Sequence, residues 1–140
     1  WYIRLENLGE KVVSTPIVFG GVVYFTTYTP DPSGGAVDPN DPCAGTTAKG
    51  VGRLYAVDYK TGGGVHDWSS DTETDGDGNT VEHGKKDRTK IVGYSMPSPP
   101  VIAILESGPK LYIGIEGGVD DEDPIPVPDL NIIYWRQITN

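Results

Sequence analysis

The sequence predicts an all-β protein built from antiparallel sheets, and three observations support that prediction. Glycine and proline account for 19 and 12 of the 140 residues, and these two residue types weaken or break helices. No stretch places apolar side chains at the i, i+3, i+4, i+7 spacing of an amphipathic helix. The apolar residues fall instead into short runs separated by Gly, Pro, Asp and Asn, which is typical of strands and turns.

The first quarter of the chain predicts a hairpin preceded by a short strand. Residues 1–5 alternate in character and are expected to form that strand. The run over residues 12–19 contains Pro16, which lacks the N–H that a central ladder needs and therefore indicates an edge or a strand start. Gly20 and Gly21 are a two-residue hairpin signal, and residues 22–28 follow as a β-branched and aromatic strand.

A strand that ends on a tight turn organises the middle of the chain. Residues 54–59 alternate between two faces, Asp58 can accept from backbone N–H groups ahead of it, and Gly62 can adopt a positive φ. The run over residues 65–68, which ends in a tryptophan, is then expected to be the outermost strand. A long insertion over residues 29–51 precedes this unit.

The second half is expected to repeat the pattern. Residues 69–90 read as a second long loop, acidic first and basic last. Residues 101–105 and 110–115 predict a hairpin around the turn 106–109, residues 116–128 a third acidic loop, and residues 130–138 a final strand.

Two stretches resemble one unit written twice. Residues 14–18 and 23–25 match residues 98–102 and 111–113, with an offset of 84 residues at the start, and each pair precedes a loop and another strand, residues 54–57 and 133–136. A strand, an Asp-x-x-Thr-Gly turn and a short run with Trp end a propeller blade of the quinoprotein-like type. We therefore expect residues 1–140 to be a single β-propeller fragment of about two blades, over residues 12–68 and 91–138, with long inserted loops. Residues 1–5 are expected to complete a neighbouring sheet.

Two blades cannot close a ring. The chain is therefore expected to be the C-terminal end of a larger propeller or a self-associating fragment with exposed edges. Because it begins at Trp1 with no leader-like segment, it is expected to be an excised or processed piece of a longer protein.

An ordered set of motifs suggests a family. The set comprises residues 1–5, 9–16, 25–28, 42–43, 52–58, 97–102 and 134–136. In this order they resemble the C-terminal end of the β-propeller of type IV pilus tip-associated biogenesis and adhesion factors, the PilY family. The resemblance implies a non-enzymatic extracellular protein, exported through the periplasm to the pilus tip or outer-membrane surface of a Gram-negative bacterium. It implies minor pilins and host or abiotic surfaces as partners, in addition to the rest of the propeller.

Two other functions stay open beside this one. The blade ending alone also fits a fragment of a quinoprotein dehydrogenase, whose propeller binds pyrroloquinoline quinone and Ca²⁺, although no paired cysteines or catalytic Asp in context support it. A purely structural propeller domain at the outer membrane is the third reading, because fold does not determine function.

A calcium loop is the sharpest chemical candidate. Residues 71–82 place oxygen side chains and a glycine, Gly76, at the spacing of a twelve-residue Ca²⁺ loop. The candidate ligands are Asp71, Glu73, Asp75, Asp77, Asn79 and Glu82. Against this reading, no amphipathic helix flanks the loop, and Gly78 stands where such loops place an apolar residue. The calcium loop of the resembled family lies in another inter-strand loop, so its residues do not carry over. The alternative is a solvated acidic loop.

Other acidic and histidine residues favour no further metal site. The run Asp120-Asp121-Glu122-Asp123 is expected to be a solvated, self-repelling loop. His66 and His83 lack Cys or His neighbours at zinc-ligand spacing and a nucleophile that they could activate. Cys43 is a free thiol, a partner for a cysteine elsewhere, or a small packed residue.

Charge and aromatic content narrow the remaining classes. A net charge of −9 is wrong for a nucleic-acid surface, and no apolar segment reaches membrane-spanning length. The basic cluster Lys85, Lys86, Arg88 and Lys90 is expected to balance the acidic residues before it. The tryptophans are expected to fill the core between blades, and Tyr28 and Tyr94 are expected to be exposed. The tryptophans are Trp1, Trp68 and Trp135.

Overall fold

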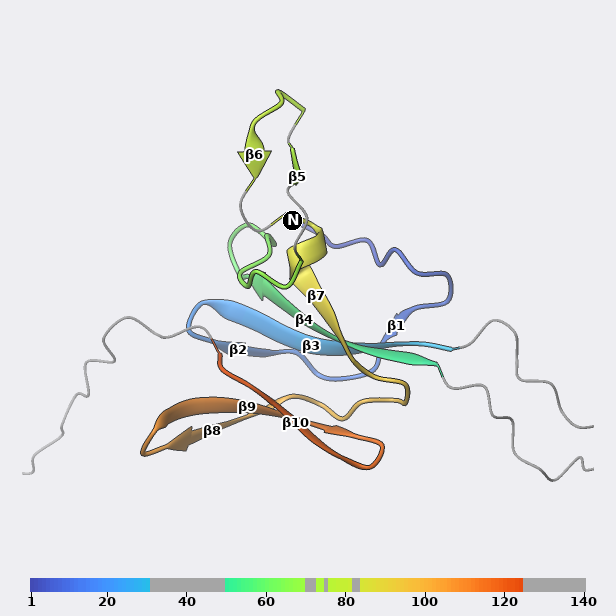
Figure 1. Ribbon diagram of the computed structural model, residues 1–140, viewed down its shortest axis with the longest axis vertical. Coiled ribbons are helices and arrows are strands. Elements are labelled where there is room, and N and C mark those ends of the chain that lie inside the picture. The colour runs from blue at the N-terminus through green and yellow to red at the C-terminus, as the bar shows by residue number, and fades with distance from the viewer. Residues whose placement is uncertain (31–49, 70–72, 75, 82–83, 125–140) are drawn as a thin grey trace, which may run out of the picture.

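The computed structural model describes residues 1–30, 50–69, 73–74, 76–81 and 84–124, and these residues form an all-β protein. Their single helical element is one turn of 3₁₀-helix, η1 (Lys86–Arg88). The strands form a main sheet, a three-stranded sheet and a small separate hairpin (Figure 1). The predicted fold class is therefore confirmed. In the described part of the chain, no helix is long and apolar enough to span a bilayer.

The main sheet is an antiparallel sheet of five strands, and the β5–β6 hairpin is inserted in the chain between its strands β4 and β7. Strands β2 (Ile17–Phe19), β3 (Val22–Thr29), β4 (Val51–Asp58) and β7 (Thr89–Gly93) pair antiparallel in that order, and β1 (Lys11–Val12) also pairs with β3. Gly20 and Gly21 have φ of 59° and 82°, which the tight turn between β2 and β3 requires. The predicted hairpin is confirmed.

The turn after β4 forms as predicted. The Asp58 carboxylate accepts from the backbone N–H groups of Lys60 and Thr61 at 2.9 and 2.8 Å. The hydrogen bond from Thr61 is the main reason that the pKa of Asp58 lies below its ordinary value. Gly62 has φ of 70° and donates to the Asp58 carbonyl at 2.8 Å. The side chain and the carbonyl of Asp58 together thus hold Lys60, Thr61 and Gly62 in place.

Residues 65–68 are not the outermost strand, so that prediction is wrong. After the turn only Gly64 bridges to β4, at Val57, and the chain then leaves the sheet. Three consecutive glycines offer no side chains for cross-strand packing at this point. The outer place belongs to β7, where Thr89 and Ile91 face Tyr55 and Arg53 across the ladder.

The second sheet has the strand order β10-β9-β8. Strand β8 (Val101–Leu105) and strand β9 (Gly108–Ile115) form the hairpin that the sequence predicts. Strand β10 (Gly118–Glu122) pairs along β9 from Ile115 to Leu111. The acidic run at 120–122 is therefore part of a strand, and the prediction of a loop there is wrong. A strand tolerates consecutive carboxylates because neighbouring side chains point to opposite faces.

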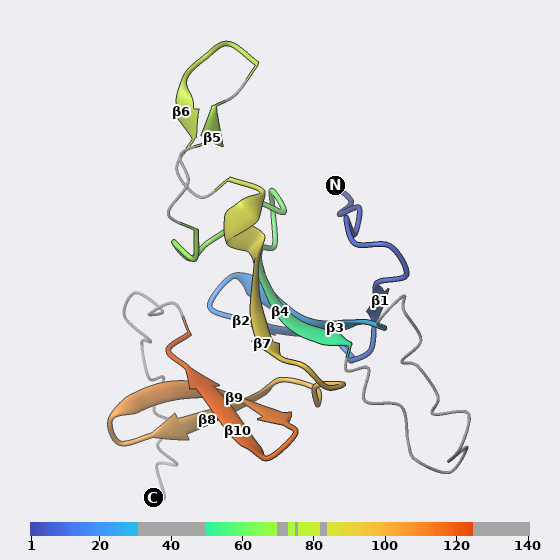
Figure 2. The same ribbon diagram turned by 45° about the vertical axis from the view of Figure 1, so that its right-hand side comes forward.

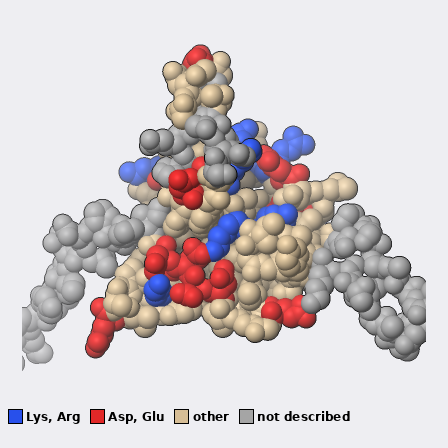
Figure 3. Space-filling view, viewed as in Figure 1, with Lys and Arg blue, Asp and Glu red and all other residues tan. Residues whose placement is uncertain are grey.

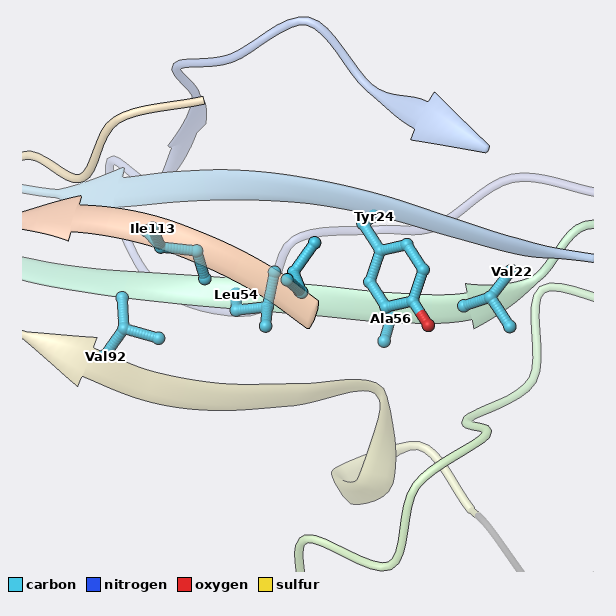
Figure 4. Packing of buried hydrophobic residues seen from close by; sticks show 7 residues of the cluster. Val22, Tyr24, Leu54, Ala56, Val92 and Ile113 are labelled. Carbon is cyan, nitrogen blue, oxygen red and sulfur yellow. The ribbon is translucent and has the colours of Figure 1, made fainter. Parts of the chain in front are cut away.

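The two sheets pack face to face and share one core (Figures 1 and 4). Tyr24, Leu54 and Ala56 of the main sheet lie against Leu111 and Ile113 of β9, and all five are essentially inaccessible to solvent. On the far side of the main sheet, a second cluster of Phe25, Tyr55 and Val57 is covered by Ile3 and Leu5. The Phe25 and Tyr55 rings stack at 4.8 Å.

Residues 1–5 form no strand in this structure, contrary to the strand expected there. They pass over the far side of the main sheet, and the Trp1 indole N–H donates to the Tyr59 carbonyl at 2.9 Å. Trp1 was expected to fill a core, but its side chain is 61% exposed, so that prediction is wrong. A small hairpin of β5 (Glu73–Thr74) and β6 (Thr80–Val81) extends away from both sheets (Figure 2).

Candidate functional site

The duplicated sequence unit has a matching hydrogen bond in each copy. In the first copy the Ser14 hydroxyl oxygen accepts from the backbone N–H of Thr26 in β3 at 2.8 Å. In the second copy the Ser98 hydroxyl oxygen accepts from the backbone N–H of Gly114 in β9 at 2.8 Å. The serine that opens each copy thus fixes its first strand beside the same position of its second strand. This agreement supports the internal repeat.

The two copies stack in the same orientation, head to tail. Tyr24 pairs with Ile17 in the first copy, and Tyr112 pairs with Val101 at the matching place in the second. We call the side of each sheet that carries these tyrosines its front face and the opposite side its back face. The front face of the first sheet packs on the back face of the second, which carries Leu111.

Head-to-tail stacking leaves the front face of the second sheet uncovered by any described residue. Val101 and Val119 on this face are 58% and 65% exposed, and Tyr112 is half-buried. In the first copy, Ile17 and Tyr24 occupy the matching positions and pack in the shared core. The open front face thus carries exposed apolar side chains at positions that the molecule covers in its first copy, beside the charged pairs of Lys110 with Asp121 and Asp123.

The acidic strand β10 divides its charges between two lysines. Asp120 and Glu122 lie on the back face, and both form ion pairs with Lys90 of β7. The distance between the Lys90 Nζ and the Asp120 Oδ2 is 3.5 Å. On the front face, Asp121 and Asp123 pair with Lys110 at 3.7 and 2.5 Å, and the bond to Asp123 raises the pKa of Lys110. Acidic side chains gather around the end of β10 with basic ones beside them (Figure 3). Lys90 therefore ties the two sheets together.

The candidate calcium loop falls partly outside the described residues. Glu73 lies in β5, and Asp77 and Asn79 lie in the turn before β6. The remaining three candidate ligands, Asp71, Asp75 and Glu82, lie outside the described part. Glu73 pairs with Val81 and Thr74 with Thr80, so the described residues make a β-hairpin. The positive φ falls at Gly78, not at Gly76, where a twelve-residue calcium loop turns. The calcium site stays a prediction.

The histidine and aromatic residues singled out in the sequence do not assemble into a site in the described part of the chain. His66 stacks on Trp68 with ring centroids 4.6 Å apart, and Trp68 packs partly buried against the core. Tyr94 is 63% exposed, as expected, whereas Tyr28 is half-buried. Cys43, His83 and Trp135 lie outside the described residues. Among the described residues, no three His, Cys, Asp or Glu side chains are grouped so that they could hold a metal ion.

A buried carboxylate, which the sequence did not indicate, lies at the edge of the back face of the first sheet. Glu10 accepts at one oxygen from the Thr27 hydroxyl at 2.6 Å and from the Tyr55 hydroxyl at 3.1 Å. Its other oxygen accepts from the Asn7 amide at 2.6 Å. Burial opposes ionisation, but these hydrogen bonds outweigh it and lower the pKa of Glu10. Burial, together with the charge of Glu10, raises the pKa of Tyr55.

A cationic cleft of about 260 Å³ lies beside this network. It is bounded by the segment of residues 3–7, by β4, and by η1 with the start of β7. Five of the eleven basic residues of the chain line it, in a protein of net charge −9. These are Arg4, Arg53, Lys85, Lys86 and Arg88. The sequence showed only the cluster at 85–90, because Arg4 and Arg53 arrive from distant segments.

No family model, curated protein or solved structure matches the chain.

Proposed function

We propose that this chain is a non-enzymatic interaction module, a segment of a β-propeller that acts in a type IV pilus tip-associated factor. The observation that supports the propeller is the head-to-tail stacking of two copies of one antiparallel unit. When the front face of one unit binds the back face of the next, further units can add in the same way. The units form a closed ring when the rotations between successive units add up to a full turn. A sheet whose front face is open then calls for a further unit of the same kind.

The shape of the first unit also supports this architecture. Strands β2, β3, β4 and β7 form a four-stranded antiparallel meander in chain order, which is the composition of a propeller blade. The second unit supplies β8, β9 and β10 in the same manner. Residues 130–138, the predicted final strand, lie outside the described residues.

The pilus role and the location outside the cell rest on the ordered motifs that resemble the PilY family. Long loops on a rigid sheet scaffold fit a binding role, since binding residues concentrate on such loops. Minor pilins, host or abiotic surfaces, and the remainder of the propeller are the proposed partners. Calcium, held by the loop over residues 71–82, is the proposed modulator.

The first experiment tests the open front face by sedimentation velocity. We expect the chain to self-associate through the front face of its second sheet and the part of the back face of its first sheet around Val18, which is 66% exposed. Val101→Glu on the former and Val18→Glu on the latter should each reduce association, because a carboxylate cannot be buried unpaired. Ile104→Glu is the matched control, since Ile104 is 74% exposed and lies outside both docking surfaces. A stable monomer at high concentration would argue against the propeller.

The second experiment tests the pilus role separately. In the organism that carries the gene, deletion should reduce the number of surface pili seen by electron microscopy, and the intact gene should restore them. Unchanged piliation and unchanged surface attachment would refute the pilus role while leaving the propeller proposal intact.

Calcium binding is tested by titration of the chain with Ca²⁺. One site should appear, and the double variant Asp71→Ala, Glu82→Ala should lose it, because it removes both ends of the ligand set. Binding that persists in the double variant would sink the calcium proposal.

A further inference from the structure

The cationic cleft is chemically suited to a ligand that the proposed function does not account for. Three arginines line it from three separate segments: Arg4 from the N-terminal segment, Arg53 from β4 and Arg88 from η1. Each guanidinium stays charged at any physiological pH and offers several N–H donors in a planar fork. Lys85 and Lys86 add positive charge at the same cleft.

One donor at the cleft lacks a protein acceptor. The Nε atom of Arg88 is buried and makes no hydrogen bond with any described residue. Arg88 lines the cleft. Buried polar atoms in folded proteins are nearly always satisfied, so this exception calls for an explanation. An oxygen-rich ligand at this position would supply the missing acceptor.

Basic residues outnumber acidic ones around the cleft. Among the described residues that line it, Glu6 alone is acidic, whereas Arg4, Arg53 and Arg88 contribute guanidinium groups from three segments. Two nearby carboxylates are buried and hydrogen-bonded: Glu10 accepts from Thr27, Tyr55 and Asn7, and Asp87 accepts from the backbone N–H of Ser69. An anion gains more here than on the rest of this acidic surface.

We propose that this cleft binds a small oxyanion with at least two negative charges, of the phosphate or carboxylate type. The volume of about 260 Å³ lies just below the range of about 300–1,000 Å³ that is typical of pockets for drug-sized ligands, which favours a compact anion. Forked guanidinium donors match the paired oxygens of either chemical type. The buried Nε–H of Arg88 is a further donor available to the oxygens of such an anion.

The test is isothermal titration calorimetry with inorganic pyrophosphate and, in a parallel series, with citrate. The two probes distinguish a phosphate site from a carboxylate site. Wild-type protein should bind at least one of them saturably at one site per chain, more weakly as NaCl rises. Arg88→Gln should weaken binding about tenfold or more. Arg4→Gln, at an exposed side chain, should weaken it severalfold without a risk to folding.

Lys60→Gln and Lys11→Gln are the matched controls, because each removes one positive charge at an exposed residue that does not line the cleft. Their affinities should stay within about twofold of wild type. The proposal is overturned if neither probe binds saturably at low salt. It is also overturned if the controls weaken binding as much as the arginine variants do, since general charge would then be the cause. Neither outcome decides the propeller proposal, because Val18 and Val101, the two positions that test its docking surfaces, do not line the cleft.

Discussion

Replacing the buried carboxylate of Glu10 with an amide tests whether the charge itself stabilises the fold. In Glu10→Gln the hydroxyls of Thr27 and Tyr55 would donate to a neutral oxygen, and the new NH₂ would meet the Asn7 donor. A hydrogen bond to a charged group contributes about 1 kcal/mol more than one between neutral groups. The two hydroxyl donors therefore lose about 2 kcal/mol of stabilisation, and the variant regains part of this because it buries no charge. The free energy of unfolding should fall by about 1–2 kcal/mol. The measurement is urea unfolding at pH 7.

The pH dependence gives this prediction a second readout. The folded-state pKa of Glu10 lies below its ordinary value of 4.5, so the stabilising effect of the charge is complete above that pH. It is lost as the pH falls through the lowered pKa, so the gap between wild type and Glu10→Gln should shrink there. Glu6→Gln, at an exposed residue, should show no such gap. Equal stability at pH 7, or a gap of the same size at pH 7 and pH 3, would refute the reasoning.

Three further predictions use the same unfolding assay. Leu111→Ala should destabilise by about 2–5 kcal/mol because it opens a cavity between the sheets, whereas Ile104→Ala, at an exposed site, should change stability by less than about 0.5 kcal/mol. Ser14→Ala and Ser98→Ala should each cost about 1 kcal/mol, and unequal losses would argue against equivalent roles. Gly62→Ala should cost about 1–3 kcal/mol because its φ is 70°, and a wild-type midpoint would contradict the strained turn.

Local signals predicted the turns of this fold well. The turn at Asp58 and the hairpin at Gly20 and Gly21 depend on residues within four positions of one another, so the sequence contains their whole explanation. The repeat was also visible, since it needs only a comparison of the chain with itself. Its matching serine hydrogen bonds give the similarity a physical basis.

The errors arose where distant residues decide the outcome. The acidic run at 120–122 looked like a loop because its charges repel one another, but Lys90 and Lys110 divide those charges between two faces. The strand that pairs with the outer edge of β4 is β7, not residues 65–68. Which segment pairs there depends on which one packs better against β4, and the local sequence does not show this. The cationic cleft was missed because its arginines meet only in the folded chain.

Among the described strands, the two edges of the second sheet differ in a way that limits edge-to-edge contacts of that sheet. Strand β8 carries no charged side chain and pairs with no described strand except β9, whereas β10, at the other edge of the described sheet, carries three consecutive carboxylates. Charged edges resist pairing with other chains. Edge-to-edge contact between copies of this described sheet therefore has to use β8. When two β8 strands pair antiparallel, the backbone N–H and C=O groups of each edge are hydrogen-bonded by the other. Such contacts end at a symmetric pair and do not extend into fibrils.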